Sequence, residues 1–258
     1  MTLPPPSAPP TNWFAQGGHA YAQFRPDYPP ALAADLAALA PSHSLAVDVG
    51  CGNGQLTRWL GAHFAQVLGL DPSADQLAHA HAGAQLRYAV AAAEQLPLPD
   101  ASVQLLTVAQ AAHWFDLPAF YRQVQRVLVP GGVIALISYG ALQLPETALQ
   151  ARFAHFYQHE IGPFWPPERQ LVDSGYATLD FPWAPLPAPQ HTISQCWSLA
   201  QLLGYIATWS ATKQALQQGR SALLAAFARD MQALWGDAST TRLVQWPIRM
   251  RLGRSQKT

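Results

Sequence analysis

The chain has 258 residues, 50% of them apolar and 12% charged, and its 15 basic and 15 acidic side chains balance to a formal net charge of zero. This balance leaves no broad basic surface for nucleic-acid phosphates, so we expect a small-molecule partner and no nucleic acid. The apolar runs are far shorter than the roughly 20 residues of a membrane-spanning helix, and Cys51 and Cys196 form neither a disulfide framework nor a zinc pattern. We expect a cytoplasmic protein with no membrane partner; the oligomeric state stays open.

Prolines dominate the N-terminus and predict a disordered tail over residues 1–12, followed by a single domain over 13–258. Within a core at 31–139, short apolar runs alternate with helix-forming segments, which is typical of a parallel sheet with helices on both faces. The predicted fold class is α/β, with an open, doubly wound sheet. The expected strands are 45–49, 66–70, 86–90, 103–108 and 133–138, and the expected helices are 31–40, 55–64, 74–82 and 117–128.

A glycine-rich loop follows the first predicted strand. Gly50, Gly52 and Gly54 alternate in Val-Asp-Val-Gly-Cys-Gly-Asn-Gly, directly before helix-forming sequence. Glycines accept positive φ and let a ligand lie against the main chain, and a helix N-terminus offers unpaired N–H groups. Asp71 ends the second strand, where a carboxylate is placed to accept hydrogen bonds from two ribose hydroxyls. Together these features predict a site for an adenosine-containing ligand.

The spacing of the glycines bears on which cofactor this is. In the dinucleotide fingerprint the third glycine follows the second by three residues, whereas Gly52 and Gly54 are two apart. The spacing favours a cofactor other than NAD. An NAD(P)-dependent oxidoreductase remains an alternative, and so does a protein that binds the cofactor without catalysis, because its loop would look the same.

Beyond Gly140 the alternation of strands and helices loosens. The sequence predicts helices over 146–160, 198–211 and 221–235, an aromatic-proline turn over 162–167, and a last strand over 243–252. We expect a helical, aromatic-rich insertion after the fifth strand, at about 141–238, to act as a lid on the substrate side, and the final strand to fall within about 240–252. Pro247 favours an edge or bulged position for that strand.

Five segments occur in the order of a known family: the glycine loop, Gly-Leu-Asp-Pro-Ser, Ala-Ala-Glu-Gln-Leu-Pro-Leu-Pro-Asp, Ser-Val-Gln-Leu-Leu-Thr-Val-Ala-Gln-Ala-Ala-His-Trp-Phe, and Arg-Val-Leu-Val-Pro-Gly-Gly. Over 45–138 the chain resembles the class I S-adenosylmethionine-dependent methyltransferases, specifically the methyltransferase type 11 group. Weaker likenesses at 21–29, 162–169 and 202–210 resemble the trans-aconitate methyltransferase-like branch.

This resemblance implies a Rossmann-like, seven-stranded, mainly parallel sheet of order 3-2-1-4-5-7-6 with one antiparallel strand. It implies S-adenosyl-L-methionine as cofactor and S-adenosyl-L-homocysteine as product. The glycine loop and Asp48 would border the methionine part, Asp71 would hold the ribose, Ala93 and Glu94 would flank the adenine, and Gln110 would approach the methionine part. The implied cofactor-binding residues are Tyr21, Arg25, Asp48, Gly50, Cys51, Gly52, Asn53, Gly54, Asp71, Pro72, Ala93, Glu94 and Gln110.

The implied reaction is the in-line transfer of a methyl group to a small-molecule acceptor, for which a carboxylic acid is one candidate. The protein mainly has to align the acceptor and exclude water. His113 is the catalytic candidate, to deprotonate or orient a substrate hydroxyl or carboxyl; otherwise it is a histidine bonded to neighbouring backbone. The substrate-binding candidates are Trp114, Tyr139, Trp165 and Arg169. His155 and His159 lie one helical turn apart, but no glutamate follows the first, so we expect no metal.

Overall fold

The computed structural model describes residues 26–256, which divide into two compact units. The sheet unit comprises residues 26–142, 167–194 and 245–256, and the helical unit comprises 143–166 and 195–244. The predicted insertion at 141–238 therefore contributes to both units, because 167–194 belongs with the sheet. The predicted tail at 1–12 lies outside the described residues.

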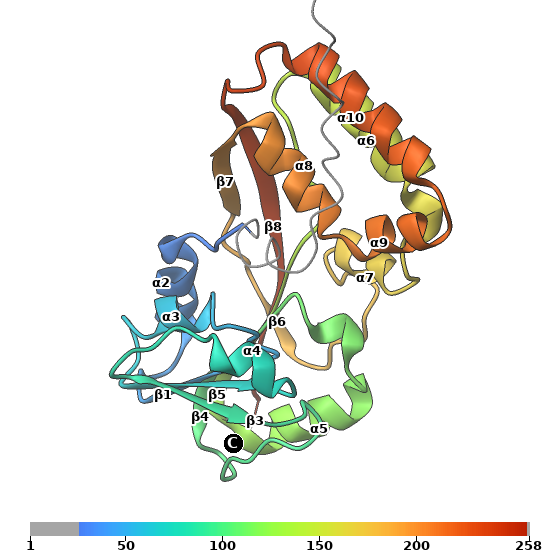
Figure 1. Cartoon of the computed structure of the whole chain (residues 1–258). Helices are drawn as coiled ribbons and strands as arrows, with labels where there is room; N and C mark the ends of the chain where they lie inside the picture. The colour runs from blue at the N-terminus through green and yellow to red at the C-terminus, as the bar shows by residue number, and fades with distance from the viewer. Residues whose placement is uncertain (1–25, 257–258) are drawn as a thin grey trace, which may run out of the picture. The chain divides into compact units, whose positions relative to one another are not determined.

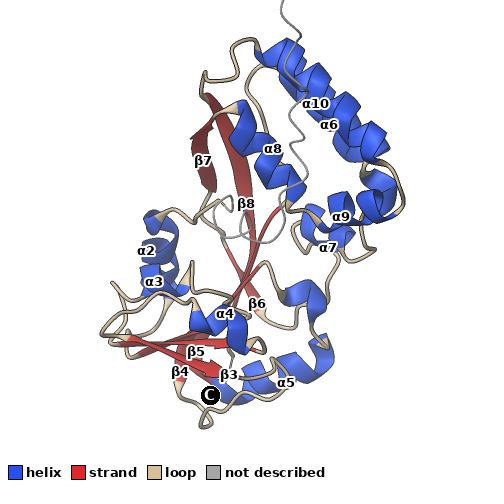
Figure 2. Cartoon of the chain, viewed as in Figure 1, coloured by secondary structure: helices blue, strands red, loops and turns tan. Residues whose placement is uncertain are grey.

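Within the described residues, eight strands form one mixed sheet (Figures 1 and 2). Seven of them follow the order β3-β2-β1-β4-β5-β8-β6, and β7 pairs with β8 outside this path. Neighbours from β3 to β5 are parallel, whereas β8 runs antiparallel to β5 and β6. Without β7 this is the implied order 3-2-1-4-5-7-6, and the doubly wound fold is confirmed. The strands are β1 Leu45–Val49, β2 Gln66–Asp71, β3 Leu86–Val90, β4 Val103–Ala109, β5 Leu128–Tyr139, β6 Ala184–Leu186, β7 His191–Trp197 and β8 Arg242–Arg254.

Helices of the sheet unit cover both faces of this sheet. The α5 helix lies on one face, and α2 and α3 lie on the other (Figure 1). The bounds are α2 Pro30–Leu39, α3 Thr57–Leu60, α4 Ala74–Ala78, η1 Ala112–Trp114, α5 Leu117–Val127 and α7 Arg169–Asp173. The helices predicted over 55–64 and 74–82 are therefore shorter than expected. In α4 no residue is buried, so no tertiary packing extends a helix that would be marginal by itself.

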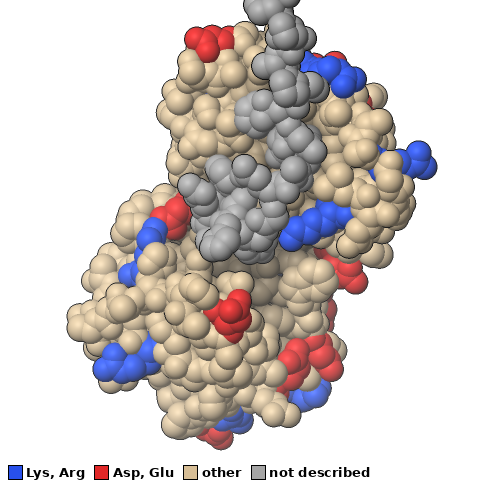
Figure 3. All heavy atoms as spheres, viewed as in Figure 1, with Lys and Arg blue, Asp and Glu red and all other residues tan. Residues whose placement is uncertain are grey.

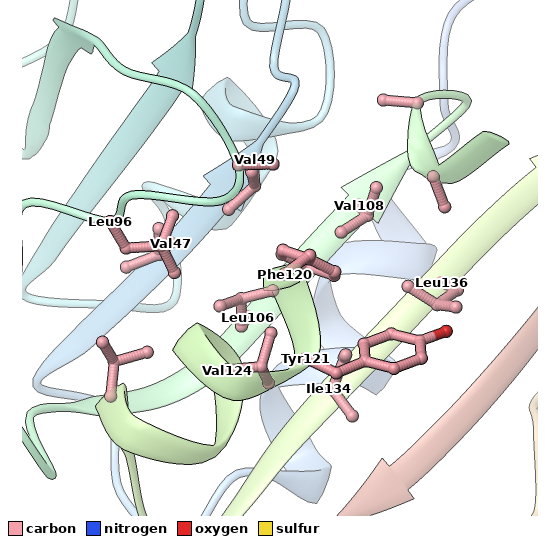
Figure 4. Packing of buried hydrophobic residues seen from close by; sticks show 14 of the residues in the cluster. Val47, Val49, Leu96, Leu106, Val108, Phe120, Tyr121, Val124, Ile134 and Leu136 are labelled. Carbon is pink, nitrogen blue, oxygen red and sulfur yellow. The ribbon is translucent and has the colours of Figure 1, made fainter. Parts of the chain in front are cut away.

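The core between α5 and the sheet explains why the strands read as continuous apolar runs. Every residue of β4 up to Val108 is buried, because helices cover both of its faces. Phe120, Tyr121 and Val124 of α5 pack over the strand residues that Figure 4 labels. The apolar residues of β1, β4 and β5 in this cluster include Val47, Val49, Leu106, Val108, Ile134 and Leu136.

The fifth strand begins earlier than the predicted 133–138. Pro130-Gly131-Gly132 is typical of a turn, yet β5 runs through it from Leu128 to Tyr139. Val103 of β4 pairs with Leu128, and Leu105 pairs with Val133, so the register shifts across the intervening residues. Gly131 takes φ +73°, a value that glycine accepts without strain. The glycines therefore form an irregularity inside the strand.

The helical unit contains α6 Thr147–His155, the π-helix η2 Phe156–Glu160, η3 Gly162–Phe164, α8 Leu199–Ala207, α9 Ser210–Gln217 and α10 Ser221–Trp235. The predictions over 146–160 and 221–235 match α6 with η2 and α10. The helix predicted over 198–211 is instead two helices. Thr208 donates its hydroxyl to the Tyr205 carbonyl at 2.6 Å, and Trp209 is extended, with φ −67° and ψ 143°, which ends α8 and starts α9.

The last strand is longer than predicted and is not at an edge. β8 lies between β5 and β6, although Pro247 favoured an edge or bulge. Pro247 is tolerated because the register with β5 begins one residue later, at Ile248. On the face drawn in Figure 3, acidic and basic side chains lie scattered among uncharged residues. Across residues 26–256, no helix combines the length and apolarity needed to cross a bilayer.

Candidate functional site

The glycine loop lies at the carboxyl ends of β1 and β2. The backbone N–H groups of Gly50 and Cys51 both donate to the Leu70 carbonyl, at 2.7 and 3.0 Å. This ties the start of the loop to the end of the neighbouring strand. Gly50, Gly52 and Gly54 take φ values of +70°, +55° and +81°, so each occupies a conformation that side chains rarely adopt.

The three glycines differ in what they face. A Cβ at Gly50 would lie 2.5 Å from the Ala111 Cβ, and one at Gly54 would lie 2.4 Å from the Tyr88 hydroxyl. At Gly52 the nearest atom is the Gln76 Oε1, at an ordinary 3.7 Å. Gly50 and Gly54 are therefore required for packing within the protein. Of the three, Gly52 has room beside it for a ligand.

Asp71 lies directly against this loop. Its Oδ2 accepts the Gly52 N–H at 2.8 Å, and its Oδ1 accepts the Ser73 N–H at 2.9 Å. The expectation that the glycine loop and this carboxylate lie together is confirmed. Each carboxylate oxygen accepts more than one hydrogen bond, so Asp71 retains acceptor capacity after both contacts. Pro72, which follows it, is exposed.

Asp48 lies beneath the loop and is buried. Its two oxygens accept the hydroxyls of Thr57 and Thr107, each at 2.7 Å. Burial raises the pKa of Asp48 to about 6. The hydrogen bonds from the two hydroxyls act in the opposite direction and lower the pKa, whereas the charge of Asp71 raises it slightly. Both carboxylate oxygens thus tie β1 to α3 and β4. Contact between Asp48 and the methionine part of a cofactor stays a prediction.

The outer side of the loop is braced by the segment before β3. The Asn53 carbonyl accepts the His81 N–H at 3.2 Å, and the Tyr88 hydroxyl donates to the His81 carbonyl at 2.9 Å. Cys51 is buried, and burial raises the pKa of its thiol, so the thiol stays protonated. These contacts hold the loop without a ligand, and they give Cys51 a packing role.

Gln110 has unusual geometry at the carboxyl end of β4. Its φ is +58°, which is uncommon for a residue other than glycine and marks strain of the kind found at functional sites. Its backbone N–H donates to the Ile137 carbonyl at 2.9 Å, and its Nε2 donates to the Tyr139 carbonyl at 2.8 Å. Its Oε1 is buried and has no hydrogen-bond partner among the described residues. The structure thus brings Gln110 and Tyr139 together and leaves a buried acceptor.

His113 follows in η1, two residues after Ala111, whose Cβ faces Gly50. Its Nδ1 lies 3.0 Å from the hydroxyl of Tyr176, a fully buried residue with φ +61°. Burial, and to a smaller extent the charge of Arg169, lower the pKa of His113 to about 4, while Glu168 acts in the opposite direction. The ring is therefore neutral near pH 7. The alternative prediction for His113 was a hydrogen bond to neighbouring backbone. In the structure its Nδ1 instead meets the side chain of Tyr176.

The other predicted residues lie in several places. Ala93 is buried, and Glu94 accepts the Asp116 N–H through Oε1 at 2.9 Å, which joins the loop after β3 to the start of α5. Trp114 is 65% exposed. Arg169 donates to Asp173 at 3.0 Å within α7.

Three of the predicted site residues are not among the described residues of the sheet unit. Trp165 belongs to the helical unit, with its ring centroid 5.7 Å from that of Tyr157 and 5.2 Å from that of Trp209. Tyr21 and Arg25 lie outside the described residues. The part of the chain that the structure describes holds no cluster of three or more His, Cys, Asp or Glu with metal-binding geometry.

Sequence reasoning missed the residues that support the site. Thr57 and Thr107 hold Asp48, Tyr88 fills the space at Gly54, and Tyr176 meets His113 across 63 positions of sequence. Thr57 had a detectable signal, since it follows the loop at the start of a predicted helix. Tyr176 had none, because its segment carries no regular pattern.

Comparisons with known proteins agree with this geometry. Residues 47–136 match the family model described as a methyltransferase domain. A candidate methyltransferase of Dictyostelium discoideum is 32% identical over 234 residues, covering 87% of each chain. A malonyl-[acyl-carrier protein] O-methyltransferase of Dechloromonas aromatica is 37% identical over 155 residues, covering 58% of this chain and 57% of the relative.

Among solved structures, a candidate type II methyltransferase from Anaeromyxobacter dehalogenans is 40% identical and superposes with a TM-score of 0.85, covering 91% of this chain and all of that one. The YcgJ protein of Bacillus subtilis, 16% identical with a TM-score of 0.53, covers 88% of this chain and 99% of its own and shares the fold. The family match and the relatives favour a methyltransferase over the alternative of a nicotinamide-dependent oxidoreductase. The chain therefore belongs to the class I S-adenosylmethionine-dependent methyltransferases, within the methyltransferase domain family.

Proposed function

We propose that the carboxyl ends of β1, β2 and β4 form a binding site for S-adenosyl-L-methionine and that the protein transfers its methyl group to a small carboxylic acid. One observation carries the cofactor site: the open side of Gly52 and the carboxylate of Asp71 adjoin, with a 2.8 Å hydrogen bond between them. Open α/β sheets bind ligands at this edge. Asp71 would accept the ribose hydroxyls with its remaining lone pairs.

In this proposal, different residues bind the two ends of the cofactor. Ala93 and Glu94, the latter held by its contact with Asp116, would flank the adenine. Val90, nearby in sequence at the end of β3, is an apolar residue that is 60% exposed. At the other end, the buried and unpartnered Oε1 of Gln110 suits the ammonium of the methionine part. A buried acceptor without a partner is costly, so a donor from a ligand would relieve that cost.

The chemistry needs little from the protein besides alignment. The bound cofactor supplies an electrophilic methyl group on a sulfonium, and the acceptor atom displaces the thioether in line. The residues of this chain would orient the acceptor and exclude water. The residues proposed to contact the acceptor all belong to the sheet unit: His113 and Trp114 in η1, Tyr139 and Arg169.

Two considerations support a carboxylic acid as acceptor. Weak likenesses outside the core resemble the trans-aconitate methyltransferase-like branch, and relatives named malonyl-[acyl-carrier protein] O-methyltransferases match about half of the chain.

Calorimetry tests the cofactor, and transfer of a labelled methyl group tests the acceptor. We expect S-adenosyl-L-methionine and S-adenosyl-L-homocysteine to bind and NAD not to bind. In a panel of small carboxylic acids, phenols and amines, the label should pass to carboxylic acids. Transfer to phenols or amines alone would reject the acceptor class while leaving the cofactor assignment in place.

A further inference from the structure

The hydroxyl of Tyr176 lies within hydrogen-bond distance of His113 Nδ1. This hydroxyl is fully buried, and its hydrogen-bond partner in the described structure is His113 Nδ1 at 3.0 Å. The single phenol proton then needs an acceptor, and His113 Nδ1 is the one within reach.

The opposite arrangement leaves a buried group unsatisfied. If His113 Nδ1 carried the proton and donated it to the phenol, no residue between 26 and 256 would accept the phenol proton. An unsatisfied buried donor costs about 1–3 kcal/mol, which is enough to select one tautomer. A neutral imidazole holds one proton, so an unprotonated Nδ1 places it on Nε2.

We propose that Tyr176 is a positioning residue that holds His113 as the Nε2–H tautomer, so that His113 donates a hydrogen bond to an oxygen of the methyl acceptor and does not serve as its general base. This inference rests on the proposed function, because it assigns His113 to the acceptor side of that site. It excludes one of the two roles that the sequence left open for His113.

With the proton on Nε2, the methyl acceptor must be a group that is already deprotonated when it binds. When a carboxylate oxygen attacks the methyl carbon, an O–C bond forms, the C–S bond breaks, its electron pair goes to sulfur, and no proton moves. A phenol, an alcohol or an ammonium acceptor must first lose a proton, and an Nε2–H imidazole whose Nδ1 is occupied cannot take it. A donor imidazole suits a carboxylate. The charged groups that act on this ring, Arg169 and Glu168, oppose each other in sign.

The position of η1 supports the assignment to the acceptor side. Gln110, Ala111 and His113 follow β4 at the ligand-binding edge of the sheet, and the Ala111 Cβ faces Gly50 of the glycine loop. His113 Nε2 has no hydrogen-bond partner among residues 26–256. In the proposal, this nitrogen is the donor that meets the ligand.

Nitrogen-15 correlation spectra of histidine-labelled protein near pH 7 report the tautomer directly. The signals of His113 are identified by their loss in the His113→Gln variant. We expect an unprotonated Nδ1 and a protonated Nε2, and in Tyr176→Phe a mixture of both tautomers. Tyr121→Phe is the matched control, because it removes another phenol hydroxyl of the sheet unit, which donates to the Asp180 carbonyl at 2.8 Å. A protonated Nδ1 in the unaltered protein, or an unchanged tautomer in Tyr176→Phe, overturns the proposal.

Kinetics with a carboxylic acid acceptor gives the second readout. A lost hydrogen bond to a charged group corresponds to roughly 10-fold or more in kcat/KM, so His113→Ala should lose about that much. His113→Gln retains an N–H donor and should recover part of the loss, chiefly through KM. Equal losses in both variants contradict the donor role. The absence of any methyl transfer would instead reject the proposed function, while the tautomer measurement would stand by itself.

Discussion

At the residue scale, Asp71 both holds the glycine loop and, in the proposed function, binds the cofactor. Removing its carboxylate should therefore weaken cofactor binding more than removing an ordinary surface carboxylate. It accepts the Gly52 and Ser73 N–H groups, and in the proposed function it also accepts the ribose hydroxyls. Asp71→Ala should weaken binding of S-adenosyl-L-methionine by about 1.5–3 kcal/mol, the range for hydrogen bonds to a charged acceptor, as measured by calorimetry. Asp75→Ala, which removes an exposed carboxylate in the first turn of α4, is the control and should leave affinity unchanged. Unaltered affinity in Asp71→Ala would remove this residue from the cofactor site.

Gly54 shows how two costs add at one residue. Its φ of +81° disfavours any side chain, and a Cβ there would also lie 2.4 Å from the Tyr88 hydroxyl. Gly219 has a similar φ of +73°, and a Cβ added there would meet nothing within 4 Å, so Gly219→Ala measures the backbone cost alone, about 1 kcal/mol. Gly54→Ala should lower the free energy of unfolding by about 2–4 kcal/mol in urea titrations, because overpacking adds to the backbone cost. Equal losses of stability in Gly54→Ala and Gly219→Ala would show that the Tyr88 side chain moves aside without a measurable cost.

The residues predictable from sequence were those whose role follows from their place in a strand or loop. Asp71 ends a strand beside a glycine loop, and the carboxyl ends of parallel strands meet at one edge, so its contact with Gly52 could be predicted. Tyr176 could not be, because its hydroxyl reaches His113 only through a fold that joins positions 63 apart in the chain. Gly50 and Gly54 stay predicted cofactor-binding residues, but no sequence pattern indicated that a side chain at these positions would meet Ala111 and Tyr88.

At the scale of elements, helix α8 carries a complete capping box. The Ser198 side chain accepts the Gln201 N–H, and the Gln201 side chain accepts the Ser198 N–H at 2.8 Å. Ser198→Ala should therefore lower the free energy of unfolding by about 1 kcal/mol. Ser221 begins α10, whose N-cap is Arg220 without a side-chain hydrogen bond, so Ser221→Ala is the matched control and should cost little. A similar loss in both variants would mean that the capping box adds nothing to the stability of α8.

Element boundaries were harder to predict than the elements themselves. The order of strands and the positions of α5 and α10 follow from apolar periodicity, because both helices bury a regular stripe. The lengths of α3 and α4 do not follow from periodicity. In α4 no residue is buried, so no tertiary packing extends the helix. The start of β5 was missed because Pro130-Gly131-Gly132 is read locally as a turn, whereas pairing with β4 continues on both sides of it. In these places tertiary pairing outweighs local propensity.

At the scale of the whole molecule, the buried Asp48 and the half-buried His113 give opposite dependences of stability on pH. Burial and Arg169 lower the pKa of His113 from 6.5 to about 4, so its contribution to stability is complete above pH 6.5 and is lost as pH falls toward 4. Burial raises the pKa of Asp48 from 3.8 to about 6, so its contribution is complete below pH 3.8 and is lost as pH rises through 6. Because the two windows overlap between pH 4 and 6, the contributions oppose each other in the unaltered protein.

Single substitutions should expose each dependence in turn. The destabilisation caused by His113→Gln should shrink as pH falls from 7 to 4, because the histidine it replaces loses its contribution over that range. The destabilisation caused by Asp48→Asn should instead shrink as pH rises from 4 to 7, because a charged Asp48 is costly in a buried position held by Thr57 and Thr107. Urea titrations at intervals across this range, each compared with the unaltered protein, measure both trends. If the two variants followed the same trend with pH, one of the two groups would have to be exposed to solvent in the folded protein, contrary to the burial that shifts both pKa values.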